Sequence, residues 1–86
     1  MVIFKVELVI DSTQSIIVPQ GAKPLSVQKQ NGKLMLWFAC SPSAECVQQK
    51  EVNIVGTGHS FPDDWLGNYV GTVQQQSDLV LHVFVH

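Results

Sequence analysis

Side chains typical of acid–base and nucleophilic chemistry gather in one short segment, "IVGTGHSFPDDW", at residues 54–65. His59, Ser60 and Asp63 supply the three residue types of a hydrolytic triad. Neighbouring residues on an extended chain point apart, however, and known triads are assembled in space from separate segments. The segment also lacks the G-x-S-x-G pattern of a nucleophile elbow. We therefore predict no catalytic residue and expect that the protein is not an enzyme.

The same segment holds potential metal ligands. His59, Asp63 and Asp64 lie within it, and His82 or His86 could join them from the end of the chain. Zinc and manganese accept such sets of nitrogen and oxygen atoms. The spacing H-x3-D-D is not a recognised ligand pattern, and a solvated acidic loop is the favoured interpretation. We therefore predict no metal and no cofactor.

Two glycines flank a threonine directly after the apolar run, at Gly56, Thr57 and Gly58. Such a segment can form a nest of backbone N–H groups that holds a phosphate. A small phosphorylated ligand, such as a nucleotide messenger, is therefore an alternative, with Lys23 or Lys33 as the basic neighbour. No long helical pattern follows, so the dinucleotide-binding fingerprint is not met. A glycine bulge followed by a turn is favoured.

Aromatic residues cluster beyond the glycines, at Phe61, Trp65 and Tyr69. Ser60 as an N-cap and Pro62 at the first helical position would give one helical turn that places Phe61 and Trp65 on one side. The favoured interpretation is that these rings close one end of the core. The alternative is a protein-binding patch, because tryptophan and tyrosine are typical anchors. The predicted binding surface comprises Gly56, Thr57, Gly58, His59, Phe61, Asp63, Asp64, Trp65 and Tyr69.

The overall composition narrows the possible partners. The chain has 86 residues, of which 45% are hydrophobic and 14% charged, with a net charge of −2 and no arginine. Duplex nucleic acid is therefore not expected as a partner, since phosphate recognition relies on clustered basic residues. A small core and a low charge make a homodimer a reasonable hypothesis, through residues 34–39 or the last strand.

Membrane insertion and export are not expected. No apolar run reaches the ~20 residues that span a bilayer, and Lys5 and Glu7 interrupt the apolar N-terminus. We therefore expect a cytoplasmic protein in which Cys40 and Cys46 are free thiols. A disulfide between them, or a structural zinc site, is a less favoured alternative.

Six or seven short apolar runs separated by turn residues predict one all-β domain over residues 1–86. We expect a small antiparallel barrel or a two-sheet sandwich. "NG" at residues 31–32 predicts a type I′ hairpin, and its second arm is apolar on both faces, which favours a central position. A helical turn over residues 44–49 is an alternative at the start of the next strand. The triplet "VGT" at residues 55–57 and 70–72 is interpreted as two equivalent glycine bulges.

Alternation within the strands predicts which side chains form the core. Phe4, Val6, Leu8 and Ile10 share one face, as do Leu25 and Val27; Leu34, Leu36 and Phe38; and Leu79, Leu81, Val83 and Val85. A final hairpin is expected to turn at Ser77 and Asp78.

The stretches "PQGAKPLSVQKQNGKLMLWF", "IVGTGHSFPDD", "YVGTVQ" and "LVLHVFV" cover most of the chain. In this order they resemble a small family of phage and prophage proteins with no assigned activity. The resemblance implies a viral origin and a compact, β-rich accessory protein in the host cytoplasm. It suggests binding to a host protein, such as inhibition of host defence in the manner of an anti-CRISPR protein. The alternatives are a protein that sequesters a nucleotide messenger and a minor structural protein of the virion.

Overall fold

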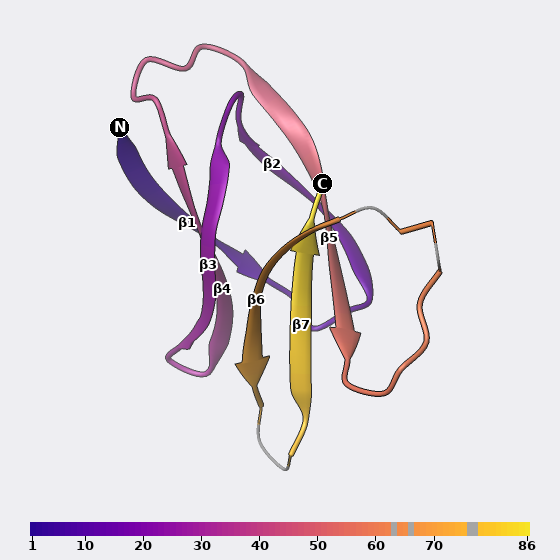
Figure 1. The fold of residues 1–86 in the computed structure, drawn as a ribbon. Coiled ribbons are helices and arrows are strands. Elements are labelled where there is room, and N and C mark those ends of the chain that lie inside the picture. Colours follow the sequence, from indigo (N-terminus) through magenta and orange to yellow (C-terminus); the bar gives the residue numbers. More distant parts are fainter. Residues whose placement is uncertain (63, 66, 76–77) are drawn as a thin grey trace.

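The computed structural model describes residues 1–62, 64–65, 67–75 and 78–86. Within these residues β-strands are the regular secondary structure, joined by turns and loops, and no helix has the length and apolar character needed to cross a membrane. The seven strands of this part of the chain (Figure 1) are β1 (Val2–Leu8), β2 (Thr13–Pro19), β3 (Lys23–Gln30), β4 (Lys33–Cys40), β5 (Val47–Gly56), β6 (Asn68–Gln74) and β7 (Val80–Val85).

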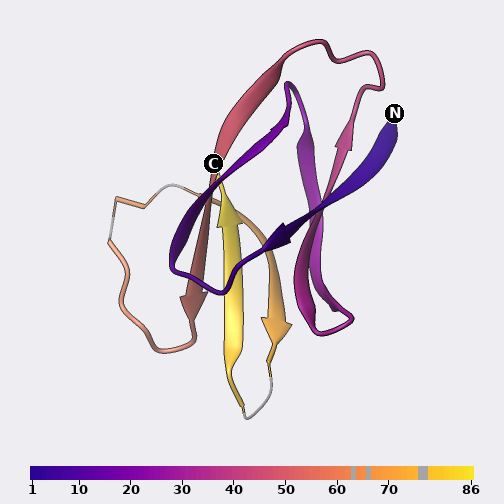
Figure 2. The ribbon, with the colours of Figure 1, turned by 180° about the vertical axis from the view of Figure 1, so that it is seen from behind.

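The strands form two antiparallel sheets that stack as a sandwich. One sheet has the order β1-β4-β3 and the other the order β2-β5-β7-β6. β3 and β6 pack against each other along one side, but no hydrogen-bonded ladder between described residues joins them. On the side away from β3 and β6, the chain passes from β1 in one sheet to β2 in the other, as Figure 2 shows. The all-β prediction is therefore confirmed, as a two-sheet sandwich and not as a closed barrel.

Apolar side chains on the facing sides of the sheets form the core. In β7, Leu81, Val83 and Val85 are buried, while the residues between them are half-buried on the outer side. This alternation confirms the predicted core face of the last strand for these three residues. Leu79 and Ile10, which were also predicted to face the core, lie just outside their strands and are exposed. The most completely buried large side chains are Phe38, Leu36, Val18, Val52, Val83 and Val85.

The Asn-Gly hairpin forms as predicted. Asn31 and Gly32 both have positive φ angles, 53° and 77°, and Gln30 lies opposite Lys33 in the register of β3 and β4. This is the backbone that a two-residue type I′ turn requires. The following strand, β4, lies between β1 and β3, in the central position that its two apolar faces predict.

One predicted detail of this region is wrong, and one alternative is not realised. Leu25 and Val27 do not share a face, because the register of β3 shifts between Pro24 and Ser26 and an extra residue reverses the alternation. Val27 is buried, whereas Leu25 is 49% exposed. The helical turn considered over residues 44–49 is also absent, since β5 begins at Val47.

Only the second of the two VGT triplets is a bulge. The register of β6 shifts between Tyr69 and Gly71, whereas Gly56 ends β5. The turn before β7 includes Asp78, whose φ angle is 66°. Ser77, the other predicted turn residue, lies outside the described residues.

Candidate functional site

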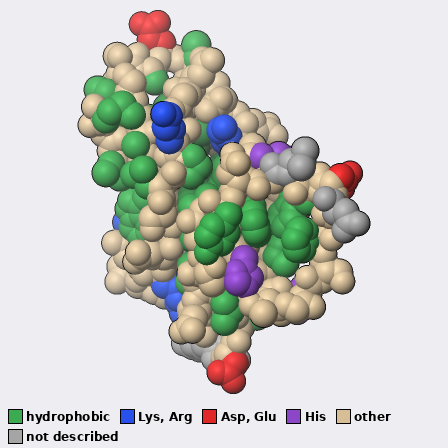
Figure 3. Space-filling view, viewed as in Figure 1, with side chains coloured by type: hydrophobic (Ala, Val, Ile, Leu, Met, Phe, Trp, Pro, Cys, Tyr) green, Lys and Arg blue, Asp and Glu red, His purple; other side chains and the backbone are tan. Residues whose placement is uncertain are grey.

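The predicted site lies on the outer face of the four-stranded sheet, where the connection between β5 and β6 packs. Side chains alternate across a strand, so this face carries every second residue. Paired positions on it include Asn53 and Val55 of β5, His82 and Phe84 of β7, and Thr72 of β6. Figure 3 shows hydrophobic side chains and a histidine gathered over β6 and β7 beside this connection.

The glycine segment forms a tight turn at the end of β5. The His59 N–H donates to the Gly56 carbonyl at 3.1 Å, and Gly58 has a φ angle of 84°. The Thr57 N–H donates to the Val80 carbonyl at 3.2 Å. Two of the amides needed for a phosphate nest are therefore already used within the chain, which disfavours that interpretation. A Cβ atom at Gly56 would lie 2.8 Å from the His59 Nδ1 atom, so the turn holds the imidazole against the strand.

The aromatic rings surround Phe84 on the outer face and do not close an end of the core. The ring centroid of Trp65 lies 5.1 Å from that of Phe84 and 4.9 Å from that of Phe61. The Tyr69 ring lies 5.6 Å from Phe84. Phe84 projects from β7 on the side opposite its core residues, so the favoured prediction of a core plug is wrong. Phe61 and Tyr69 are 51% and 60% exposed. We call these four residues the aromatic patch.

The polar part of the connection is exposed. The Trp65 N–H donates to the Pro62 carbonyl at 3.2 Å, which closes a single turn near the position predicted for a helical start. Ser60 and Asp64 are exposed. Asp63, the remaining predicted rim residue, lies outside the described residues.

A chain of hydroxyl and imidazole groups holds the connection onto the sheet. The His82 Nε2 atom lies 2.6 Å from the Thr57 hydroxyl, and its Nδ1 atom lies 3.0 Å from the Thr72 hydroxyl. The Tyr69 hydroxyl lies 2.6 Å from that of Thr72. Both ring nitrogens of His82 therefore have partners in the chain, and the start of the connection, at Thr57, is tied through His82 of β7 to Thr72 of β6. Sequence reasoning missed Thr72, which only the β6–β7 register places opposite His82.

A cavity of about 510 Å³ lies on the other side of the connection, over β5. We call it the Asn53 cavity. Asn53 is 3% exposed, and its Oδ1 atom accepts a hydrogen bond from the Thr13 hydroxyl at 3.1 Å. Sequence reasoning also missed this residue, since the pairing joins positions 40 residues apart. The cavity is lined by Ser12, Thr13, Glu51, Asn53, Ile54, Val55, Gly56, His59, Ser60, Phe61, Pro62, Trp65 and His86.

Glu51 gives the cavity a negative charge. Its Oε1 atom accepts hydrogen bonds from the Ser15 hydroxyl at 2.6 Å and from the Gln49 amide at 3.1 Å. These bonds, Ser15 first, lower the pKa of Glu51, and the charge of His86 adds a smaller effect in the same direction. Partial desolvation opposes them. The carboxylate therefore stays ionised at neutral pH.

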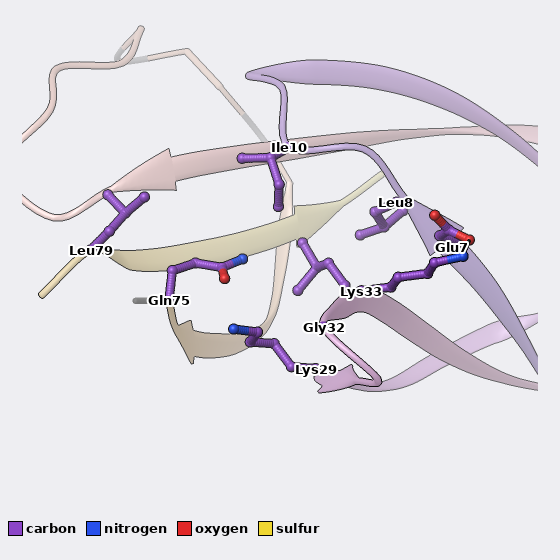
Figure 4. Close-up of a pocket in the computed structure, with 9 residues that line it drawn as sticks. Glu7, Leu8, Ile10, Lys29, Gly32, Lys33, Gln75 and Leu79 are labelled. Carbon is purple, nitrogen blue, oxygen red and sulfur yellow. Dashed lines mark ion pairs between the residues drawn. The ribbon is translucent and has the colours of Figure 1, made fainter. Parts of the chain in front are cut away.

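A second cavity, of about 530 Å³, lies at the end of the sandwich near the Asn-Gly hairpin (Figure 4). Leu8 and Ile10 line it together with Lys29 and Lys33, and the Lys33 ammonium group lies 3.7 Å from a Glu7 carboxylate oxygen. Lys33 was one candidate basic neighbour of the glycine segment. It lines this second cavity, and residues 56–58 do not.

The geometry does not support the two less favoured alternatives, a metal site and a disulfide. No three histidine, cysteine, aspartate or glutamate side chains of the described residues lie close enough together to hold a metal ion. Cys40 is buried and Cys46 is exposed, and both are free.

Fold and site together define a small β-sandwich protein with an aromatic patch on one outer face and a mixed cavity beside it. The chain belongs to the family described as a domain of unknown function (DUF7352), whose family model matches residues 1–86. The expected membership in a family without an assigned activity is thereby confirmed, and the match carries no information on a phage origin. No curated protein and no solved structure matches the chain.

Proposed function

We propose that the protein is a non-enzymatic binding protein that recognises another protein through the aromatic patch. The observation that supports this proposal is the exposure of Phe61 and Tyr69 on an outer sheet face. A ring that only filled the core would be buried, whereas these two present large apolar surfaces to solvent. Tyrosine and tryptophan are enriched among the residues that dominate binding energy in interfaces.

The patch is also held in a defined shape, which favours binding. Trp65 and Phe84 are half-buried and pack against the exposed rings of Phe61 and Tyr69. The Tyr69 hydroxyl is also hydrogen-bonded to Thr72, which His82 contacts. A surface ordered before binding loses less conformational entropy when a partner docks. An aromatic surface beside polar groups, held by these contacts, is thus suited to a protein partner.

The proposal also names the partner. The resemblance to phage proteins suggests a host protein, bound and inhibited in the host cytoplasm. A second copy of the chain is the alternative occupant. β4 and β7, the strands considered for a dimer, each pair with two neighbours in their sheets, so a second copy could reach them only through side chains.

A quantitative pull-down tests the proposal. The protein and two variants, Tyr69→Ala and Leu25→Ala, are immobilised, exposed to a bacterial lysate and analysed by mass spectrometry. Leu25 is the matched control, since it is an exposed apolar residue on the other sheet. We expect a partner that the wild type and Leu25→Ala retain and that Tyr69→Ala binds about 30-fold more weakly, as for a hot-spot residue worth about 2 kcal/mol. Equal retention by all three proteins would show that the aromatic patch is not the binding surface.

A further inference from the structure

Asn53 is a buried polar side chain with an unused hydrogen-bonding group. Its Oδ1 atom accepts from Thr13, but its Nδ2 atom has no acceptor among the described residues. Turning the amide over would only change which of its two polar atoms lacks a partner. A buried donor without a partner is rare in folded proteins and needs an explanation.

The position of Asn53 suggests that a ligand supplies the missing partner. Asn53 projects from the outer face of β5, opposite Thr13 and Phe84 in the sheet register, and it lines the Asn53 cavity. The cavity volume of about 510 Å³ falls within the range of roughly 300–1,000 Å³ that small-molecule sites occupy. A residue with a buried, unused amide therefore borders a cavity in which a small molecule would fit.

The remaining walls of the cavity define the shape of that molecule. Phe61, Pro62 and Trp65 line one part of it, and Trp65 is half-buried. Aromatic side chains favour flat ring systems, which pack against them by stacking or by edge-to-face contact. An apolar wall next to a polar floor therefore favours a planar ring that carries polar atoms on its edge.

The Glu51 carboxylate disfavours an anionic ligand in the cavity. Glu51 is a carboxylate at neutral pH, its hydrogen bonds lower its pKa further below the ordinary value, and no lysine lines the cavity. A phosphate would be repelled by this carboxylate, and the amides of Thr57 and His59 are already used. A neutral N–H group is instead a suitable partner for Glu51.

We propose that the Asn53 cavity binds an uncharged nitrogen heterocycle of the nucleobase class. A ring acceptor or carbonyl of the ligand faces the Asn53 amide, a ligand N–H faces Glu51, and the ring lies against Trp65 and Phe61. Nucleobases combine these features, a flat apolar face and donors beside acceptors on one edge. This site shares Phe61 and Trp65 with the aromatic patch, but Tyr69, the residue that the pull-down changes, does not line it.

Nuclear magnetic resonance titration tests the proposal. Adenosine, guanosine, cytidine and uridine are added separately to ¹⁵N-labelled protein, and the Asn53 side-chain amide and the Trp65 indole signals are followed. We expect at least one nucleoside to shift both signals saturably and to leave the indole signal of Trp37, on the other sheet, unchanged. If no nucleoside moves the Asn53 amide, the proposal is overturned.

Variants separate this site from the rest of the molecule. Asn53→Leu should weaken nucleoside binding about tenfold, equivalent to about 1.4 kcal/mol, and Asn53→Ala provides the same test if the larger side chain prevents folding. Asn68→Leu, an exposed asparagine in β6, is the matched control and should bind as the wild type does. Unchanged binding by both Asn53 variants would refute the assignment.

Two further comparisons fix the ligand class and separate the two proposals. The nucleoside 5′-monophosphate should bind several-fold more weakly than its nucleoside, and Glu51→Gln should reduce that difference; tighter binding of the monophosphate would contradict an uncharged ligand. Tyr69→Ala should retain nucleoside binding even where it loses the protein partner. Failure of one proposal therefore leaves the other open to its own test.

Discussion

Replacing Asn53 by leucine should stabilise the protein. Leucine keeps the branched shape of asparagine but removes the buried donor that has no partner among the described residues. Burying such a group costs about 1–3 kcal/mol. The substitution also removes the hydrogen bond from Thr13, worth about 0.5–1.5 kcal/mol, but Thr13 is exposed and its hydroxyl can bond to water instead. The expected net effect is a gain of about 1 kcal/mol in the free energy of unfolding.

Thermal and urea denaturation followed by circular dichroism measure this gain. For a domain of this size, about 1 kcal/mol corresponds to a rise of roughly 4–8 °C in Tm. Asn68→Leu is the control, because a substitution on an exposed surface usually changes stability by less than about 0.5 kcal/mol. A lower Tm for Asn53→Leu than for the wild type would refute the reasoning, since it would show that the lost hydrogen bond and the larger leucine side chain cost more than removal of the unpaired donor gains. A higher Tm together with lost nucleoside binding would show that the polar group is kept for function at a cost in stability.

Three further substitutions test how the fold supports the site. Gly71→Ala should destabilise the protein by about 1–3 kcal/mol in urea denaturation, because its Cβ would lie 2.9 Å from the Cγ1 atom of buried Val27; an unchanged midpoint would contradict the close contact of β3 and β6. Gly32→Ala should cost about 1–2 kcal/mol through its φ angle of 77° alone, since no atom crowds that position; a Tm equal to that of the wild type would refute this. Glu51→Gln should flatten the acid side of the Tm-versus-pH curve. The lowered pKa of Glu51 gives a stabilisation that is complete above its ordinary value of 4.5 and is lost as the pH falls through its folded-state pKa; parallel acid curves for variant and wild type would contradict the hydrogen bonds from Ser15 and Gln49.

Features of the fold that depend on local backbone chemistry could be predicted from the sequence. The turn at Asn31 and Gly32 depends on the positive φ angles that these two residues tolerate. The core face of β7 depends on simple alternation, which holds for Leu81, Val83 and Val85. Both signals lie within a few residues of the feature that they specify, so no knowledge of distant contacts was needed.

Features that depend on distant segments could not be predicted. The register shift at Leu25 reverses the alternation in β3, and Pro24 beside it is compatible with a bulge but equally with a strand start or a sheet edge. Alternation places Phe84 on the outer face, but the packing of Trp65 onto it depends on the path of the long β5–β6 connection. For the same reason the aromatic residues were assigned to the end of the core, although they were chosen as site residues.

In the site, too, features set by neighbouring residues could be predicted, and features set by distant segments could not. The glycine turn at Gly56 and Gly58 has a clear sequence signal. The hydrogen bonds that join His82 to Thr72 depend on a strand register that the bulge in β6 sets. The unused amide of Asn53 becomes visible only when the cavity over β5 is formed.

The placement of the aromatic patch on the outer sheet face underlies the proposed function, and a nuclear Overhauser experiment tests it most directly. In the wild-type protein, the Trp65 indole protons should show cross-peaks to the ring protons of Phe84 and Phe61, whose centroids lie 5.1 and 4.9 Å away. Cross-peaks from the Trp65 indole to the core methyl groups of Leu36 and Val83, in place of those to Phe84, would contradict it. They would show that the rings close the core and leave no aromatic surface for a partner.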